Sequence, residues 1–186
     1  MGFRKKDIPD NYIFPELPKK RNEKIYNNLY DLLENNVNPK YYLSGQLLTT
    51  LKKHKSKHSE VKSGFGYIVV NEGENPVSNT IMATGGSGKE RNLIRQLIPE
   101  YSGMVIGKKN PINNEGIRHM TPIEWGKLQG FINFAFIENG IDKFSFPEQI
   151  SDTQRYKLFG NSVSIPVINE MAKYMIERLD DFYGIE

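Results

Sequence analysis

Two histidines have the spacing of a metal-binding pair. His54 and His58 lie four residues apart on an expected helix, so both side chains fall on one face. The run around them is rich in lysine, which repels a cation, and no third ligand is apparent; the remaining histidine, His119, stands far away in the sequence. We therefore expect no metal site and assign this face to solvent or to phosphate groups.

A glycine-rich segment, GGSGKER at residues 85–91, partly matches a phosphate-binding loop. A nucleotide-hydrolysing loop needs a glycine where this chain has Ala83, and a serine or threonine where it has Glu90. Nucleotide hydrolysis is excluded on these two positions. What remains is a loop rich in hydrogen-bond donors, with Lys89, Arg91 and Arg95 close by, or a hairpin loop whose charges are incidental.

Two further segments suit an anionic ligand. The segment LKKHKSKHSEVK at residues 51–62 carries five lysines and one glutamate. This composition fits a solvated helix face, and it equally fits a surface that binds phosphate groups. GNSVSIPV at residues 160–167 is a turn that leads into a helix. Backbone N–H groups at such a junction can hold a carboxylate or phosphate, and an ordinary capped helix start explains the same pattern.

Composition sets the class of protein. The chain has 186 residues, which is the length of one domain or of one domain plus a fragment, and its hydrophobic content of 38% is that of an ordinary globular protein. It contains no cysteine, which excludes disulfides, zinc–thiolate sites and a thiolate nucleophile within these residues. No apolar run is long enough to span a bilayer, and the charged N-terminus does not resemble a signal peptide, so we expect a cytoplasmic protein without membrane contact.

Charge is unevenly distributed along the chain. The net charge is only +3, but residues 1–109 hold 18 Lys and Arg against 11 Asp and Glu, whereas residues 110–186 hold 7 against 11. The first part is therefore suited to a polyanion, and an ordinary lysine-rich surface explains the same excess of positive charge.

The elements that must position these groups are short. Apolar spacing predicts helices over residues 22–35 and 44–57, the second capped by Ser44 with Leu47, Leu48 and Leu51 facing inward. The stretch from 61 to 110 alternates turns with β-branched residues and predicts strands at 67–70, 80–84 and 104–106.

The last third of the chain is more regular. Thr121, Pro122 and Glu124 form the sequence signature of a capped helix start, and Gly130 marks the end of that helix. We expect a loop over 140–158 and a final amphipathic helix that begins near residues 164–166. The fold class is α+β, a small mixed domain of short twisted strands and helices.

Two segments in this order resemble a known family. RHMTPIEWGKLQGF (118–131) resembles motif IX of the DNA cytosine-5 methyltransferases, and SDTQRYKLFGNSVSIPVINEMA (151–172) resembles their motif X. Upstream, KSGFGYIVV (62–70) and SNTIMATGGSGKERNLI (78–94) are similar to the two loops of the target recognition domain, and MGFRKKD is similar to the strand that closes motif VIII. The resemblance is closest to bacterial restriction–modification enzymes.

The departures from the family pattern are mild within the motifs and large outside them. Met120, Lys127 and Ile132-Asn133 replace the usual Leu, Arg and Pro-Asp. The FxGxG, Pro-Cys and Glu-Asn-Val motifs are absent, so the chain resembles only the C-terminal part of such an enzyme. The resemblance implies a connector from the catalytic domain (1–20), a recognition domain (21–158) and a motif X helix (159–186), the flanking pieces being remnants of a Rossmann-like domain.

The resemblance also implies roles for individual residues. Double-stranded DNA is the expected partner and S-adenosylmethionine the expected cofactor, with Asn161, Ser162 and Val163 lining the methionine end of its pocket. Arg118, Thr121 and Glu124 are expected to act structurally. No catalytic residue is expected here. Expected DNA contacts are made by Lys62, Ser63, Gly64, Phe65, Thr80, Thr84, Gly85, Gly86, Ser87, Lys89 and Arg91, with further phosphate contacts from Lys52, Lys53, Lys55 and Lys57.

Three functions fit these expectations. The chain is half of a methyltransferase that works with a separate catalytic subunit or a missing N-terminal domain, or a truncated member that is inactive alone. It is otherwise a stand-alone DNA-binding or regulatory module. Under the first two hypotheses, the chain by itself transfers no methyl groups, because the nucleophilic cysteine is absent.

Overall fold

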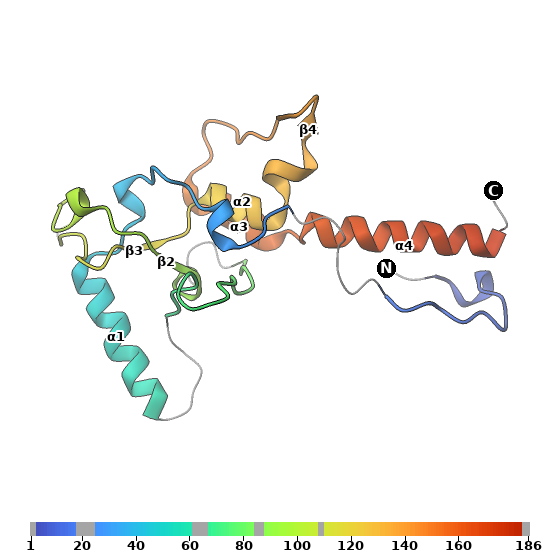
Figure 1. Ribbon diagram of the computed structural model, residues 1–186, viewed down its shortest axis with the longest axis horizontal. Helices are drawn as coiled ribbons and strands as arrows, with labels where there is room; N and C mark the ends of the chain where they lie inside the picture. The colour runs from blue at the N-terminus through green and yellow to red at the C-terminus, as the bar shows by residue number, and fades with distance from the viewer. Residues whose placement is uncertain (1–2, 18–24, 61–66, 84–87, 108–109, 184–186) are drawn as a thin grey trace.

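The computed structural model describes residues 3–17, 25–60, 67–83, 88–107 and 110–183. Figure 1 shows a body of short elements from which one long helix, α4, extends as an arm, with the N-terminal segment running beside it. The helices are α1 (Gly45–Glu60), α2 (Pro122–Gln129), α3 (Asp152–Asn161) and α4 (Ile165–Tyr183). Single 3₁₀ turns occupy Lys5–Asp7, Leu29–Leu32, Pro39–Tyr41, Lys89–Arg91 and Pro99–Tyr101.

The strands form two small antiparallel pairs. β2 (Leu93–Arg95) pairs with β3 (Ile117–His119), with Ile94 opposite Arg118. β4 (Ile137–Glu138) pairs with β5 (Ile141–Asp142) in a hairpin after the irregular turn Phe131–Ala135. The first pair lies at the centre of the body and leads directly into α2, so it sets where that helix begins.

Local sequence explains the helices of the last third. The predicted capping box of α2 is present: Thr121 Oγ1 accepts from the Glu124 N–H, and the Glu124 carboxylate accepts from the Thr121 N–H. Gly130 ends α2 in the left-handed region at φ 77°. The final helix was predicted to begin at 164–166 and begins at Ile165. Helix α1 likewise follows Ser44, whose hydroxyl accepts from the Leu47 N–H.

The helix predicted over 22–35 is wrong in its described part. Only Leu29–Leu32 makes a helical turn, because the Asp31 carboxylate accepts from the N–H groups of Asn27 and Asn28 and starts the turn at residue 28. At its other end Leu33 is extended, with ψ 145°. Leu29 and Leu32 are still buried, so the apolar spacing marked core positions without forming a long helix.

Two predicted strands are also wrong. The described residues of the 80–84 segment form no strand, because their neighbour Asn79 pairs with the side chain of Asn92 instead of with another strand. Residues 104–106 form no strand and follow a turn at 102–103, which the Met104 N–H closes by donating to Tyr101 O. The strand predicted over 67–70 is reduced to a single bridge between Val69 and Leu93.

The predicted loop over 140–158 is wrong in two places, because β5 occupies Ile141–Asp142 and α3 begins at Asp152. Ser151 and Gln154 form a second capping box, which starts this helix. One side-chain expectation also fails on α1: Leu48 is buried as predicted, whereas Leu47 is 40% exposed.

The main core lies between the helices α2 and α3 and the strand pair. Trp125 of α2 and Tyr156 of α3 meet edge to face, with their ring centroids 4.8 Å apart, and the Tyr156 hydroxyl donates to Met120 O at 2.5 Å. The other buried members of this cluster are Leu29, Leu32, Val70, Ile94, Met120 and Phe159. Burial raises the pKa of Tyr156, which keeps the phenol protonated and able to donate.

The arm is held by contacts between the two ends of the chain. Tyr174 of α4 donates its hydroxyl to Pro15 O at 2.7 Å, and Tyr12 donates to the Asp181 carboxylate at 2.7 Å. The Phe182 ring lies 5.1 Å from that of Phe3 and 4.6 Å from that of Tyr12. Residues 3–17 and α4 therefore form one packed unit. None of the helices described is long and apolar enough to cross a membrane.

A buried asparagine organises the turn before β3. Asn113 donates to the carbonyls of Leu43 and Ile117 and accepts from the N–H groups of Glu115 and Ile117. We expect Asn113→Ala to lower the free energy of unfolding by about 3 kcal/mol, because it leaves buried backbone groups without partners. Urea denaturation measures this, with exposed Asn114→Ala as the matched control; equal losses in the two variants would contradict the assignment.

Candidate functional site

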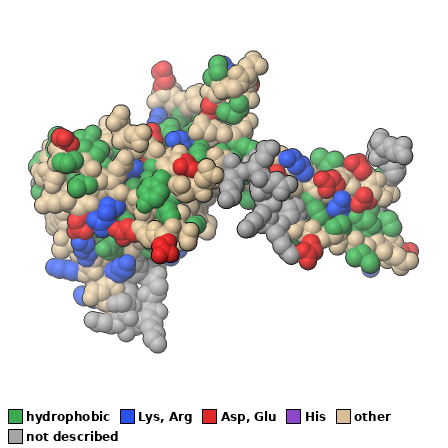
Figure 2. Space-filling view, in the orientation of Figure 1, with side chains coloured by type: hydrophobic (Ala, Val, Ile, Leu, Met, Phe, Trp, Pro, Cys, Tyr) green, Lys and Arg blue, Asp and Glu red, His purple; other side chains and the backbone are tan. Residues whose placement is uncertain are grey.

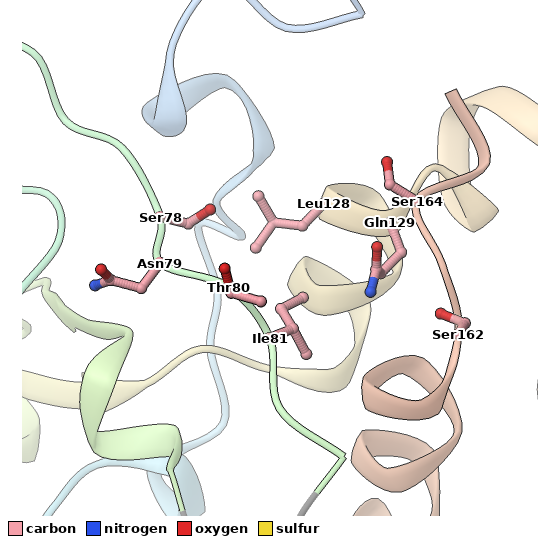
Figure 3. Close-up of a pocket in the computed structure, with 8 residues that line it drawn as sticks. All are labelled: Ser78, Asn79, Thr80, Ile81, Leu128, Gln129, Ser162 and Ser164. Atoms are coloured by element: carbon pink, nitrogen blue, oxygen red, sulfur yellow. The ribbon is translucent and has the colours of Figure 1, made fainter. Parts of the chain in front are cut away.

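One cavity brings together residues from both regions that were expected to be functional. Its volume is about 370 Å³, and it lies between residues 78–81, the end of α2 and the turn between α3 and α4. Figure 3 shows Ser78 and Thr80 on one side and Gln129, Ser162 and Ser164 on the other. Thr80, an expected DNA contact, and Ser162, an expected cofactor contact, therefore line the same space.

The polar residues at the turn between α3 and α4 differ in how far their hydrogen-bonding groups are already used. The Ser162 N–H and hydroxyl both donate to Phe159 O, at 3.2 and 2.6 Å, which fixes the end of α3. Gln129 donates to the same carbonyl at 3.0 Å and ties the turn to α2. Asn161 is exposed, and Val163 is 63% exposed. The Asn161 amide is therefore open to a ligand, while Ser162 keeps oxygen lone pairs that can accept a hydrogen bond.

The two basic residues of the expected recognition loop differ in exposure. Arg91 is exposed, so its guanidinium can reach a phosphate. Lys89 is half-buried, with its Nζ 4.1 Å from the centroid of the Tyr156 ring. Burial lowers the pKa of Lys89, and the nearby Glu90 offsets part of that effect. Lys89 thus packs on the core and is a poorer candidate for phosphate contact than Arg91.

The lysines of α1 form an exposed basic face. Lys52, Lys53, Lys55 and Lys57 all point outward, and Figure 2 shows blue side chains gathered at the lower left of the body, where α1 lies. Lys52 pairs with Glu115, and the Lys55 Nζ lies 5.0 Å from the centroid of the Tyr67 ring. Lys53 and Lys57 extend the same face, and all four side chains remain accessible to a polyanion.

Several expected contacts lie outside the described residues. They are Lys62, Ser63, Gly64, Phe65, Thr84, Gly85, Gly86 and Ser87. Of the DNA contacts named from sequence, the structure describes Thr80, Lys89, Arg91 and the four lysines of α1, and it places all of them except the half-buried Lys89 at the surface.

Arg118, Thr121 and Glu124 meet in a fully buried network. Arg118 donates to the two Glu124 oxygens at 2.8 and 2.7 Å, and both residues have no exposed surface. Glu124 also accepts from the N–H groups of Thr121 and Glu34, at 2.8 and 2.9 Å. The guanidinium makes further bonds to Gln96 Oε1 and His119 O. This network holds α2 against β3 and does not open to the cavity, so its geometry is that of a structural support.

Sequence reasoning did not single out all the cavity residues. Gln129 lies one position before the predicted helix end at Gly130, which was the available signal that it faces a neighbouring turn. Ser78, Asn79 and Ser164 lie within the motif-like segments 78–94 and 151–172, but nothing in their residue types marked them as cavity residues. Within the residues that the structure describes, no group of three or more His, Asp or Glu side chains could hold a metal ion.

Comparisons with known proteins agree with the sequence motifs. The family model for C-5 cytosine-specific DNA methylase matches residues 1–177. The chain is 38% identical over 184 residues to the type II methyltransferase M.HpaII of Haemophilus parainfluenzae, a match that covers 98% of this chain and 46% of the relative. It is 34% identical over 182 residues to the type II methyltransferase M.SsoII of Shigella sonnei, a match that covers 97% of this chain and 39% of the relative.

A solved structure shows the same fold. The Entamoeba histolytica methyltransferase EhMeth superposes with a TM-score of 0.56 at 22% identity, covering 90% of this chain and 46% of that one. The chain thus spans less than half the length of the relatives it matches.

The buried ion pair should dominate stability around the cavity. We expect Arg118→Met to lower the free energy of unfolding by about 3–5 kcal/mol, because it leaves the Glu124 carboxylate buried without its counter-charge. Such a loss is a large fraction of the stability of a domain this size. Urea denaturation of Arg118→Met beside Arg91→Met, which removes an exposed guanidinium, measures the difference. A loss below about 1 kcal/mol for Arg118→Met would show that the pair is replaceable.

Proposed function

Because this chain belongs to the family of C-5 cytosine-specific DNA methylases, we propose that it is the DNA-recognition part of a DNA (cytosine-5-)-methyltransferase. It binds duplex DNA at a short specific site, and a catalytic part outside these residues methylates C5 of a flipped cytosine with S-adenosylmethionine. As for the type II methyltransferases it resembles, the setting is a restriction–modification system.

The observation that carries this proposal is the shared cavity. Thr80 and Ser162 stand 82 positions apart in the sequence and line one space. A methyltransferase must hold DNA and methyl donor close together, because the methyl group passes directly from one to the other. A stand-alone DNA-binding module has no need for a turn of motif X beside its DNA contact.

The DNA-binding role rests on exposure and charge. Arg91 and the α1 lysines are accessible cations, and the expected recognition segments lie in the same basic half of the chain. Phosphate contacts supply affinity and register, whereas base edges read in the major groove supply sequence specificity. Flipping a base out of the duplex costs a few kcal/mol, which these contacts offset. Thr80 then meets the phosphate beside the flipped nucleotide.

The exposed groups of the α3–α4 turn fit the methionine end of S-adenosylmethionine. That end carries an ammonium and a carboxylate, and the open Asn161 amide offers both an acceptor and a donor. Ser162 offers an oxygen acceptor from the cavity wall. When bound, the cofactor supplies the methyl group; this chain supplies only part of the pocket.

The nucleophile has to come from another part of the enzyme. Covalent catalysis on cytosine needs a thiolate, and these 186 residues include no cysteine. The arm is the proposed contact for that part. Its large exposed apolar side chains include Ile13, Leu17, Val167, Ile176, Leu179 and Tyr183. We assign residues 1–20 and 159–186 to the catalytic domain, and the exposed apolar side chains of the arm support that division.

Arg91 offers a direct test of DNA binding. We expect Arg91→Ala to weaken binding to a fluorescent duplex and to reduce the salt slope of the affinity by about 0.9, since one phosphate contact is lost. Fluorescence anisotropy over a series of salt concentrations measures both quantities. A duplex enriched from a random-sequence library on the unaltered chain serves as the ligand.

Lys173→Ala is the matched control, because Lys173 is an exposed cation on the arm. It should leave both affinity and slope unchanged. An unaltered slope in Arg91→Ala would place the DNA surface elsewhere, and the absence of any enriched duplex would contradict the DNA-recognition role.

Methyl transfer should depend on an added catalytic part. We expect the chain alone to transfer no labelled methyl groups from S-adenosylmethionine to duplex DNA. Adding the portion of the Haemophilus parainfluenzae relative that lies outside the matched region should restore transfer. Ile176→Asp, which places a charge on the exposed apolar face of α4, should reduce that restoration at least tenfold, about 1.4 kcal/mol in association.

Lys173→Ser, on the same helix, should keep the restored activity. Methyl transfer by the unaccompanied chain would overturn the assignment of the nucleophile. If Ile176→Asp does not reduce the restored methyl transfer, the catalytic part does not bind this face of the arm.

A further inference from the structure

Asn92 holds the segment that carries Thr80. Its side chain is 1% exposed; its Oδ1 accepts from the Asn79 N–H at 2.7 Å, and its Nδ2 donates to Asn79 O at 3.1 Å. Asn79 in turn donates from its own amide to Arg91 O at 2.8 Å. One buried side chain therefore satisfies both main-chain groups of the residue directly before Thr80, as a neighbouring strand would.

Gly160 makes room for the same segment farther along. A Cβ at this position would lie 2.3 Å from Met82 O, 2.6 Å from Met82 C and 2.8 Å from Ala83 Cα. All three are main-chain atoms, so no side-chain rotation relieves the overlap. Gly160 has ordinary helical geometry within α3, where alanine is the better helix former. The crossing of the segment is thus what demands glycine here.

We propose that Asn92 and Gly160 are positioning residues that fix Thr80 relative to the α3–α4 turn. Asn92 anchors the segment to the start of β2, and Gly160 lets it cross directly over α3, two residues before Ser162. Thr80 lies between these two supports, exposed toward the cavity. The DNA contact and the cofactor turn are then parts of one rigid unit. The consequence for binding rests on the proposed function, whereas the positioning itself does not.

The distance between Thr80 and α3 tests the positioning without DNA. Because the chain has no cysteine, nitroxide labels on Thr80→Cys and Thr153→Cys occupy only those two sites, and electron paramagnetic resonance gives their separation. We expect Gly160→Ala to shift the distance distribution and Asn92→Ala to broaden it. Gly45→Ala is the matched control, because a Cβ there finds its nearest neighbour, Pro111 O, at 3.9 Å. Unchanged distributions in both Gly160→Ala and Asn92→Ala would overturn the proposal.

A double-mutant cycle tests the consequence for DNA binding. In the unlabelled chain, Thr80→Val should weaken binding of the enriched duplex about fivefold, as the loss of one hydrogen bond does. In the Gly160→Ala background the same change should have almost no effect, because Thr80 no longer meets its partner. Additive effects would mean that Gly160 acts only on stability, which overturns the coupling.

The two proposals fail differently. If the library yields no duplex that binds, the DNA-recognition role fails while the distance measurement still decides the positioning. Circular dichroism checks that each variant is folded. If Gly160→Ala does not fold, Asn92→Ala replaces it in the cycle with the same expected loss of the Thr80 effect.

Discussion

The buried pair of Arg118 and Glu124 is the constraint on which the rest of the body depends. Two charges without exposed surface are costly to desolvate, and they persist because nearly every polar atom has a partner. Each Glu124 oxygen accepts two hydrogen bonds, one from Arg118 and one from a backbone N–H. The pair joins β3 to α2 and also holds the chain at Glu34, so it fixes three segments with one set of contacts.

The buried pair positions the cavity through a series of contacts. Helix α2 begins at the capping box that Glu124 completes, and Trp125 on its buried face packs against Tyr156 of α3. The far end of α2 holds the last turn of α3, because Gln129 donates to Phe159 O. The polar residues of the cavity are therefore surface groups on elements whose positions the buried network sets.

How much of this was predictable depends on where each hydrogen-bond partner lies. Thr121 and Glu124 are three residues apart, so the sequence alone predicted their box and the helix after it. The segment from 80 onward was predicted as a strand, yet the main chain beside it bonds to Asn92, thirteen residues on from Asn79. Likewise the Asp31 carboxylate accepts a hydrogen bond from the Asn27 N–H, in a segment that the apolar spacing had assigned to a helix. Thr80 and Ser162 were named as candidates from sequence because their motifs are long, whereas Asn92 was not, because its contacts with Asn79 arise only in the fold.

The body and the arm offer surfaces for two different interactions, electrostatic attraction and apolar burial. The body displays lysines and arginines, whose attraction to phosphate is long-range and weakens with salt. The arm displays exposed apolar side chains on residues 3–17 and on α4, and burial of such groups is short-range and is not weakened by moderate salt. If the catalytic part docks on the arm, that contact leaves the basic face free for DNA. The cavity lies where body and arm meet, beside the start of α4, so a part seated on the arm would reach Thr80 and Ser162 together.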